Sequence, residues 1–213
     1  MNKKILILII FIALIVIVGG IIFVVTKNNK TTNEPTGDME EHQDDEENLL
    51  PNVDTENVGK TLVVYFSATN NTEKVARTIS EVLSSDLIEI IPKEEYTADD
   101  LNYNNDNSRT NKENNDENAR PEISNDIELD NYDTIYLGYP IWWGKAPKII
   151  LTLLDNYNLE GKDIILFCTS GGSGIETSVD IIKNYNSKLN IITGKKFNSS
   201  VSREEIQNWI DNI

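Results

Sequence analysis

Residues 61–72 read Thr61-Leu-Val-Val-Tyr-Phe-Ser67-Ala-Thr-Asn-Asn-Thr72, and the pattern changes character at Ser67. The first six residues are β-branched, aliphatic or aromatic, which is typical of a buried strand. The next six are small and polar apart from Ala68. Apolar residues then recur at helical spacing between Val75 and Leu83. The segment therefore predicts a strand, a polar turn and a helix that begins at the turn.

The polar turn is suited to bind an anion. Free backbone N–H groups and the positive end of the helix dipole converge where such a turn enters a helix. Ser67, Thr69 and Thr72 add neutral hydroxyl donors, and Asn70 and Asn71 tolerate unusual backbone angles. The turn contains no Lys or Arg, so neutral donors would hold a phosphate here. An ordinary turn with good helix-capping residues is the alternative interpretation.

The turn differs from the familiar phosphate-binding loops. It lacks the Gly-x4-Gly-Lys-Ser/Thr of a P-loop and the Gly-x-Gly-x-x-Gly of a dinucleotide site. A receiver domain that accepts a phosphoryl group needs acidic residues at the strand ends to hold a metal. The segment from Ser67 to Thr69 offers none.

The composition indicates an acidic protein with one domain and attachments. The chain has 213 residues and a net charge of −16. Residues 1–30 hold four Lys and no acid, so the remainder carries 15 basic and 35 acidic residues, a balance of −20. Such a surface repels nucleic acid, and it favours docking to a partner protein with a cationic docking face.

Neither the single Cys nor the single His suggests chemistry. A single cysteine rules out an intrachain disulfide and argues against a Cys-rich metal site. This residue, Cys168, lies in an apolar run, which predicts a buried structural thiol. His42 lies in an acidic tract, so catalysis through a His base is not expected. We therefore predict neither a catalytic side chain nor a metal site.

The N-terminus contains an uninterrupted apolar run of 21 residues from Ile5 to Val25. As a helix this run would extend roughly 31 Å, which is about the hydrocarbon thickness of a bilayer. We therefore predict that residues 1–26 form an uncleaved, single-pass transmembrane anchor in the cell membrane. A secretory signal peptide is the alternative, but the run is long for a signal core and no Ala-x-Ala site is present.

Lysine positions predict the orientation of this anchor. Lys3 and Lys4 favour a cytoplasmic amino terminus and an extracytoplasmic domain, although Lys27 and Lys30 reduce the charge asymmetry. Residues 27–58 are rich in Asn, Thr, Glu and Asp and have almost no apolar content, which predicts an acidic, disordered linker.

The folded domain is expected over residues 59–213. Further strand patterns occur at 86–91, 132–138, 162–169 and 190–197. Helical patterns follow the segments at 132–138 and 162–169, the second running from about Ser178 to Leu189, and another closes the chain behind a capping box at Ser202 and Glu205. Alternating strands and helices predict an α/β fold with a parallel sheet covered on both faces.

Residues 93–131 are unusually polar and rich in Asn. So long a segment inside a compact domain is often a lid or an excursion over a site. Local helix is possible near 97–103 and 108–118. Arg120 is expected to form a structural ion pair rather than to bind a phosphate or carboxylate.

Two further loops follow strands at the edge where ligands bind in such sheets. Tyr139-Pro-Ile-Trp-Trp-Gly144 offers Trp rings as a stacking wall for a flat ligand, or as core residues. Thr169-Ser-Gly-Gly-Ser-Gly174 lets a planar ring approach the backbone, or is simply a flexible loop. With the turn at Ser67, these loops specify a phosphate at one end and a flat heteroaromatic ring at the other, which is the shape of FMN.

Residues 60–213 resemble the flavodoxin family in these three motifs, which occur in the same order at the same strand ends. The resemblance implies a doubly wound five-stranded parallel sheet of order 2-1-3-4-5 with FMN as cofactor. It implies that the FMN phosphate is held by Ser67, Thr69, Asn70, Asn71 and Thr72. It places beside the isoalloxazine Pro140, Ile141, Trp142, Trp143 and Gly144. It assigns to the ring and ribityl side Thr169, Ser170, Gly171, Gly172, Ser173 and Gly174.

Two positions depart from the family pattern. Position 70 is Asn where Gly is commoner, and position 170 is Ser where this branch often has His. The resemblance implies an electron carrier that shuttles one or two electrons through bound FMN. The N-terminal apolar run, which lies outside the resemblance, predicts that this carrier is tethered at the membrane. An FMN-dependent NAD(P)H oxidoreductase acting on quinone-type acceptors is the alternative, and a flavin-free sensor or binding module is a third.

Overall fold

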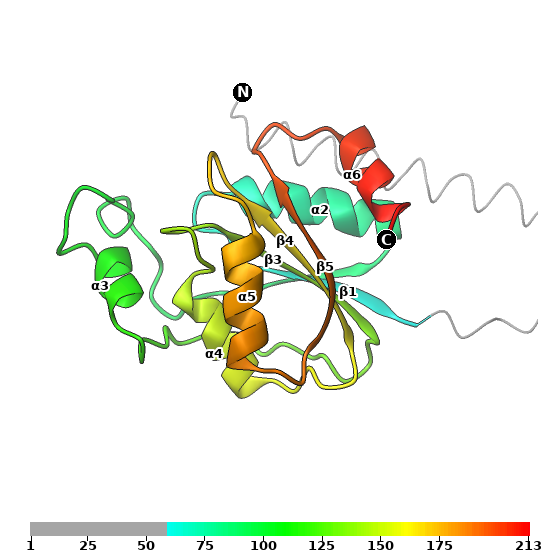
Figure 1. Ribbon diagram of the computed structural model, residues 1–213, viewed down its shortest axis with the longest axis horizontal. Coiled ribbons are helices and arrows are strands. Elements are labelled where there is room, and N and C mark those ends of the chain that lie inside the picture. The colour runs from blue at the N-terminus through cyan, green and yellow to red at the C-terminus, as the bar shows by residue number, and fades with distance from the viewer. Residues whose placement is uncertain (1–58) are drawn as a thin grey trace, which may run out of the picture. The chain divides into compact units, whose positions relative to one another are not determined.

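The computed structural model describes residues 59–213 as a parallel sheet with helices on both faces (Figure 1). The strands are β1 (Thr61–Tyr65), β2 (Asp86–Glu89), β3 (Thr134–Pro140), β4 (Asp163–Thr169) and β5 (Asn190–Phe197). All neighbouring pairs are parallel, and the order is β2-β1-β3-β4-β5. The predicted α/β fold and strand order are confirmed.

The predicted anchor at 1–26 and linker at 27–58 lie outside the described residues. Within residues 59–213, the helices are all too short or too polar to cross a bilayer.

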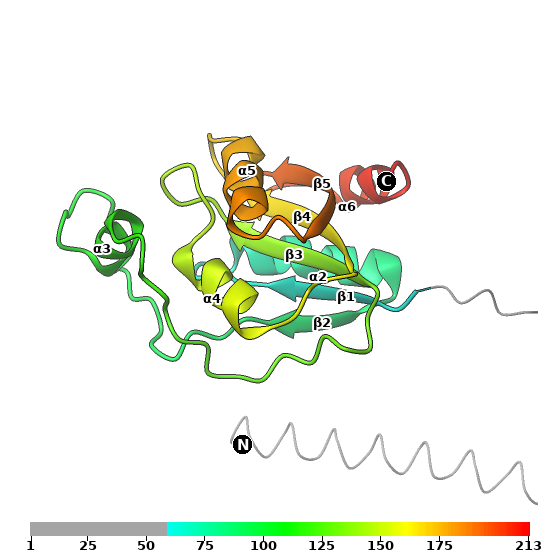
Figure 2. The same ribbon diagram turned by 60° about the horizontal axis from the view of Figure 1, so that its bottom comes forward.

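The helices form two layers around the sheet. Their bounds are α2 (Asn71–Leu83), α3 (Arg109–Asn115), α4 (Lys148–Asn156), α5 (Glu176–Tyr185) and α6 (Arg203–Ile210). Helices α2 and α6 cover one face, α4 and α5 cover the other, and α3 stands away from the sheet (Figure 2). The side chains of β1 point alternately to the two faces of the sheet and so contribute to both hydrophobic cores. Val63 and Tyr65 face α2, whereas Leu62 and Val64 face α4 and α5.

Several predicted boundaries shift in the structure. Strand β3 continues past Gly138 to Pro140, because Ile141 donates its N–H to the carbonyl of Thr169 (3.0 Å) and the pairing needs no N–H from proline. The helix expected at 178–189 is α5 and runs from 176 to 185. At α6, the Ser202 side chain accepts the Glu205 N–H at 3.1 Å, which is one of the two bonds of the predicted capping box.

The excursion, residues 93–131, is ordered by local and edge contacts. Just beyond β2, Lys93 donates its N–H to the Glu122 carbonyl and Ser124 donates its N–H to that of Ile91, both at 2.8 Å. Of the two expected helical segments, only α3 forms. Residues 97–103 form turns instead, within which the Thr97 and Asp100 side chains bond to each other's backbone N–H groups.

Arg120 forms the expected structural ion pair at the end of the excursion. Its guanidinium lies 2.7 Å from the Asp155 carboxylate and also donates to the Tyr185 hydroxyl at 3.0 Å. These contacts join the excursion to α4 and α5, so the role of Arg120 is structural.

Cys168 is fully buried near the C-terminal end of β4, as predicted. Burial raises the pKa of its thiol to about 12, so the reactive thiolate is scarce near neutral pH. We expect a thiol reagent at pH 8 to leave the native protein unlabelled and to add one label per chain after unfolding in urea. Rapid labelling of the native protein, followed by mass spectrometry, would show that this strand opens.

Candidate functional site

A cavity of about 370 Å³ lies beyond the carboxyl ends of the strands. It is lined by Thr69, Asn71, Leu101, Tyr103, Pro140, Ile141, Trp142, Thr169, Ser170, Gly171, Asn198 and Ser199. The loops that follow β1, β3 and β4 gather at this end of the domain (Figure 2). The volume is within the range of about 300–1,000 Å³ that is typical of small-molecule sites.

The structure brings together part of the predicted residue set. Eight predicted residues line the cavity, and they come from all three loops. The other predicted residues are outside the lining: Ser67, Asn70, Thr72, Trp143, Gly144, Gly172, Ser173 and Gly174.

Four lining residues were missed by the sequence analysis: Leu101, Tyr103, Asn198 and Ser199. Asn198 and Ser199 follow β5 as a short polar run, the same signal that drew attention to Ser67 after β1. Leu101 and Tyr103 come from the excursion, which was expected over a site although no residue in it was chosen.

The β1–α2 loop, residues 66–70, leads into a helix start whose backbone N–H groups lack partners among the described residues. None of the backbone N–H groups from Ser67 to Glu73 donates a hydrogen bond to any group in residues 59–213. The Ser67 hydroxyl is buried and has no partner in the same part of the chain. No side chain caps α2. These unpartnered donors at a helix N-terminus are what a bound phosphate would satisfy.

Asn70 gives the β1–α2 loop its shape. Its backbone is left-handed, with φ of 61° and ψ of 4°. Asn is one of the few residues besides Gly that adopt this conformation readily. The departure from the family's commoner Gly at this position therefore has no evident cost to the loop.

Thr169 connects the loops around the cavity. Its hydroxyl is 2.8 Å from that of Thr72, and both residues are buried. Its carbonyl accepts the N–H of Ile141, and the next N–H, that of Ser170, donates to Phe197 at 3.0 Å. The ends of β3, β4 and β5 and the start of α2 are thereby fixed relative to one another.

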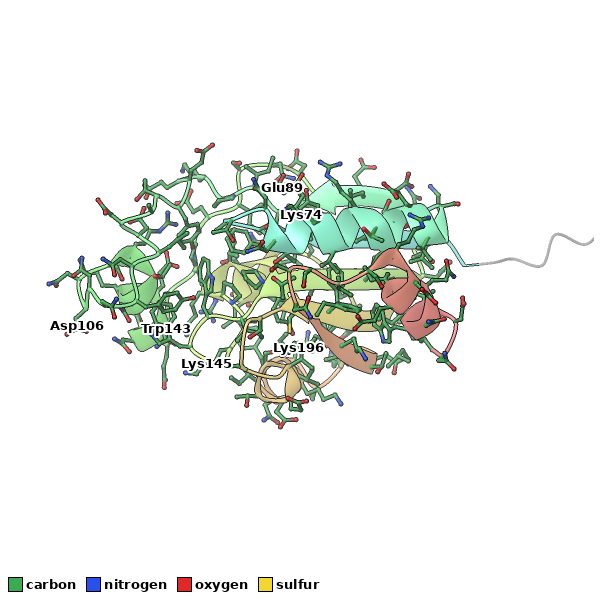
Figure 3. The ribbon with its side chains drawn as sticks, turned by 90° about the horizontal axis from the view of Figure 1, so that it is seen from above. Lys74, Glu89, Asp106, Trp143, Lys145 and Lys196 are labelled. Carbon is green, nitrogen blue, oxygen red and sulfur yellow. The ribbon has the colours of Figure 1, made fainter. Side chains whose placement is uncertain are left out.

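The two tryptophans lie in different environments. Trp142 is 8% exposed and packs edge-on against Phe66 and Tyr96, with ring centroids 5.6 and 5.2 Å away. Trp143 is half-buried and its ring centroid is 4.5 Å from that of Tyr103. Figure 3 shows Trp143 and Lys145 on the side of the domain where α3 lies.

A tight turn separates these rings. Trp142 and Lys145 exchange two backbone hydrogen bonds of 2.9 Å, and the central residues Trp143 and Gly144 have φ of 48° and 76°. A bulky residue at positive φ is unusual and tends to occur at functional sites. The N–H groups of Trp143 and Gly144 donate to nothing within residues 59–213, so this peptide is free to contact a ligand.

The β4–α5 loop, residues 170–175, gives the cavity an open side. A Cβ atom at Gly171 or Gly172 would meet nothing within 4 Å. The Gly172 N–H donates to the Ser170 hydroxyl at 3.2 Å, so the loop is shaped by its own polar contacts. A flat ring can approach this backbone without meeting a side chain at the two glycines.

The cavity is electrically neutral. None of its twelve lining residues carries a charge, and burial raises the pKa of the Tyr103 phenol, which keeps it protonated. Neutral donors at one end and apolar and aromatic surfaces at the other suit a ligand with a phosphate and a flat ring. The residues present therefore fit FMN.

The chain is similar to known proteins in both sequence and structure. The sequence model of the family described as flavodoxin matches residues 60–213. The crystal structure of a Bacteroides eggerthii protein described as a flavoprotein is 39% identical, with a TM-score of 0.70 over 73% of this chain and 98% of that chain. A flavoprotein from Lactobacillus acidophilus, solved in complex with FMN, is 29% identical, with a TM-score of 0.55 over 71% of this chain and 99% of that chain.

A curated relative extends the comparison to archaea. An uncharacterized protein of Methanocaldococcus jannaschii is 31% identical over 113 residues, and the match spans 55% of its length. The family model, by contrast, covers nearly three quarters of the present chain, from the first residues of the sheet to the C-terminus. From its fold, its site and its match to the family model, the chain belongs to the flavodoxin family.

Proposed function

We propose that this protein binds FMN in the cavity and carries one or two electrons between redox partners. Membership of the flavodoxin family and the FMN complex of the Lactobacillus acidophilus relative support FMN as the cofactor. The observation that carries the proposal is the joining of three loops at Thr169 around an uncharged cavity with unpartnered N–H donors nearby.

Each part of the site has a separate task in this proposal. The free N–H groups of the β1–α2 loop and the start of α2, with the Ser67 hydroxyl, would hold the phosphate. Ile141, Trp142 and the backbone at Gly171 would flank the ring. Bound FMN supplies the electron chemistry, and the protein orients it and excludes water.

The lining favours a carrier over an enzyme. Within the described residues, the lining has no carboxylate, amine or imidazole, and its one phenol stays protonated. The described lining therefore offers no side chain with a pKa suited to general acid–base catalysis near neutral pH. Electron transfer through a held cofactor needs no such group.

The competing function is an FMN-dependent NAD(P)H oxidoreductase with quinone-type acceptors. Leu101 and Tyr103 give the mouth an apolar side on which a second ring could rest. We expect anaerobic mixing of the FMN-loaded, full-length protein with NADPH to leave the oxidised flavin absorbance unchanged over minutes. Bleaching within seconds would instead establish the oxidoreductase.

We also propose that residues 1–26 tether the protein to the cell membrane and that the domain lies outside the cytoplasm. The acidic domain would dock to a redox partner protein with a positively charged face. The apolar run at Ile5–Val25 and the net charge of −16 support this. Full-length protein should sediment with membranes and be released when residues 1–26 are deleted. Electron transfer to the partner should slow as salt is added, since salt screens the attraction.

A further inference from the structure

The cavity has an aromatic residue that lies outside the three loops. Tyr103 lines the cavity, is 52% exposed, and belongs to the excursion between β2 and β3. Trp143 does not line the cavity, although it contacts Tyr103 with ring centroids 4.5 Å apart. The cavity lining therefore contains two aromatic side chains, those of Trp142 and Tyr103.

A flat conjugated ring has two faces, and the three loops provide an aromatic residue for only one of them. The β3–α4 loop offers Trp142, which lines the cavity. The β4–α5 loop contains Ser and Gly from 170 to 174 and offers no aromatic side chain. Tyr103, from the excursion, is the second aromatic residue in the cavity lining.

A buried side chain holds Tyr103 in place. Asn111 in α3 is 7% exposed, and its amide donates to the carbonyls of Tyr103 (3.4 Å) and Asn105 (2.8 Å). The backbone N–H of Asn111 in turn donates to the Ser108 hydroxyl, which caps α3. Asn111 thereby bonds the turn that carries Tyr103 to a short helix.

That helix is itself fixed to the site. The Arg109 guanidinium lies 3.9 Å from the Tyr96 ring centroid, and the Tyr96 hydroxyl donates to Glu113 at 2.8 Å. The Tyr96 ring packs edge-on against Trp142 and Phe66, the residue that precedes Ser67. Helix α3 is thus attached through Tyr96 to the β1–α2 and β3–α4 loops. The position of Tyr103 is therefore determined relative to these two loops.

We propose that Tyr103 is a specificity-determining residue that stacks on the flat ring of the bound cofactor, and that Asn111 is its positioning residue. The inference rests on the proposed function, because it requires that FMN occupies the cavity. It assigns to the excursion the task of selecting a conjugated ring, separate from the phosphate contacts at α2.

The first test is titration of the full-length protein with FMN and with riboflavin, followed by flavin fluorescence. Tyr103→Ala should raise both dissociation constants by the same factor, about tenfold to a hundredfold, because stacking acts on the ring that both ligands share. Tyr103→Phe should keep both near the wild-type values. Ile192→Ala, at an exposed apolar residue of β5 outside the cavity, is the control and should change neither.

A double-mutant cycle tests the positioning role. Asn111→Ala should weaken binding of both flavins in the wild-type background and have no further effect when combined with Tyr103→Ala. Effects of the two substitutions that simply add would show that Asn111 does not act through Tyr103. Circular dichroism melts of each variant verify that the variant is folded at the titration temperature.

The outcomes distinguish failure of the proposed role of Tyr103 from failure of the proposed FMN-binding function. If wild-type protein binds FMN and Tyr103→Ala binds it equally well, the role of Tyr103 is wrong while the proposed function stands. If Tyr103→Ala changes the ratio of FMN to riboflavin affinity, its effect is on the phosphate and the inference is overturned. If wild-type protein binds no flavin, both fall.

Discussion

Ser67→Asp is expected to abolish FMN binding while leaving the fold as stable as that of the wild type. The Ser67 hydroxyl is buried and unpartnered beside free N–H groups, where the phosphate is proposed to lie. Two unit charges about 4 Å apart repel by about 4 kcal/mol at an effective dielectric constant of about 20. The affinity should therefore fall by about a thousandfold or more.

The same substitution should not unfold the protein. A carboxylate at the start of α2 accepts the free N–H groups and interacts favourably with the helix dipole, a gain of about 0.3–1 kcal/mol. The melting temperature without ligand should be unchanged or higher. This separates a specific loss of the phosphate site from general damage.

Two comparisons make the Ser67 experiment decisive. Ser67→Asn keeps a polar side chain without the charge and should lose far less FMN affinity than Ser67→Asp. Riboflavin, which has no phosphate, should bind the Asp variant nearly as well as it binds wild type. Near-normal FMN binding by Ser67→Asp, measured by fluorescence titration, would place the phosphate elsewhere.

Gly138→Ala is expected to destabilise the domain more than any other exchange of glycine for alanine that we consider. Gly138 lies in the middle of the sheet, and a Cβ atom there would overlap the ring of Phe167 on β4. Phe167 is fully buried, so its ring has no free space to move into. Overpacking of this kind costs about 1–3 kcal/mol.

Urea denaturation measures this effect as a lower midpoint with an unchanged slope. Gly171→Ala is the matched control, because a Cβ atom there meets nothing within 4 Å. Gly138→Ala combined with Phe167→Leu should recover part of the loss, since the smaller side chain gives the new methyl group room. A midpoint equal to that of wild type for Gly138→Ala alone would contradict this account of the β3–β4 contact.

The sequence predicted the features that depend on neighbouring residues. The strand, turn and helix from Thr61 to Leu83 form as expected, because each is set by local pattern and by helix-start chemistry. The meeting of the three loops follows from the parallel sheet, which puts the carboxyl ends of its strands at one edge.

What the sequence did not predict depends on contacts between distant segments. Tyr103 reaches the cavity because Asn111 and Tyr96 fix its turn to α3 and to the core, and no periodic pattern encodes such side-chain bonds. Likewise, adjacent tryptophans look alike in the sequence. The tight turn between Trp142 and Lys145 decides which ring is buried, and it requires positive φ at Trp143.

The most direct measurement is a parallel titration of the full-length wild-type protein with FMN and with riboflavin. We predict one FMN per chain with quenched flavin fluorescence, and riboflavin bound about a hundredfold more weakly because it leaves the neutral donors at Ser67 and the start of α2 unused. Failure to bind FMN, or equal affinity for the two flavins, would contradict the claim that these uncharged groups form a phosphate site.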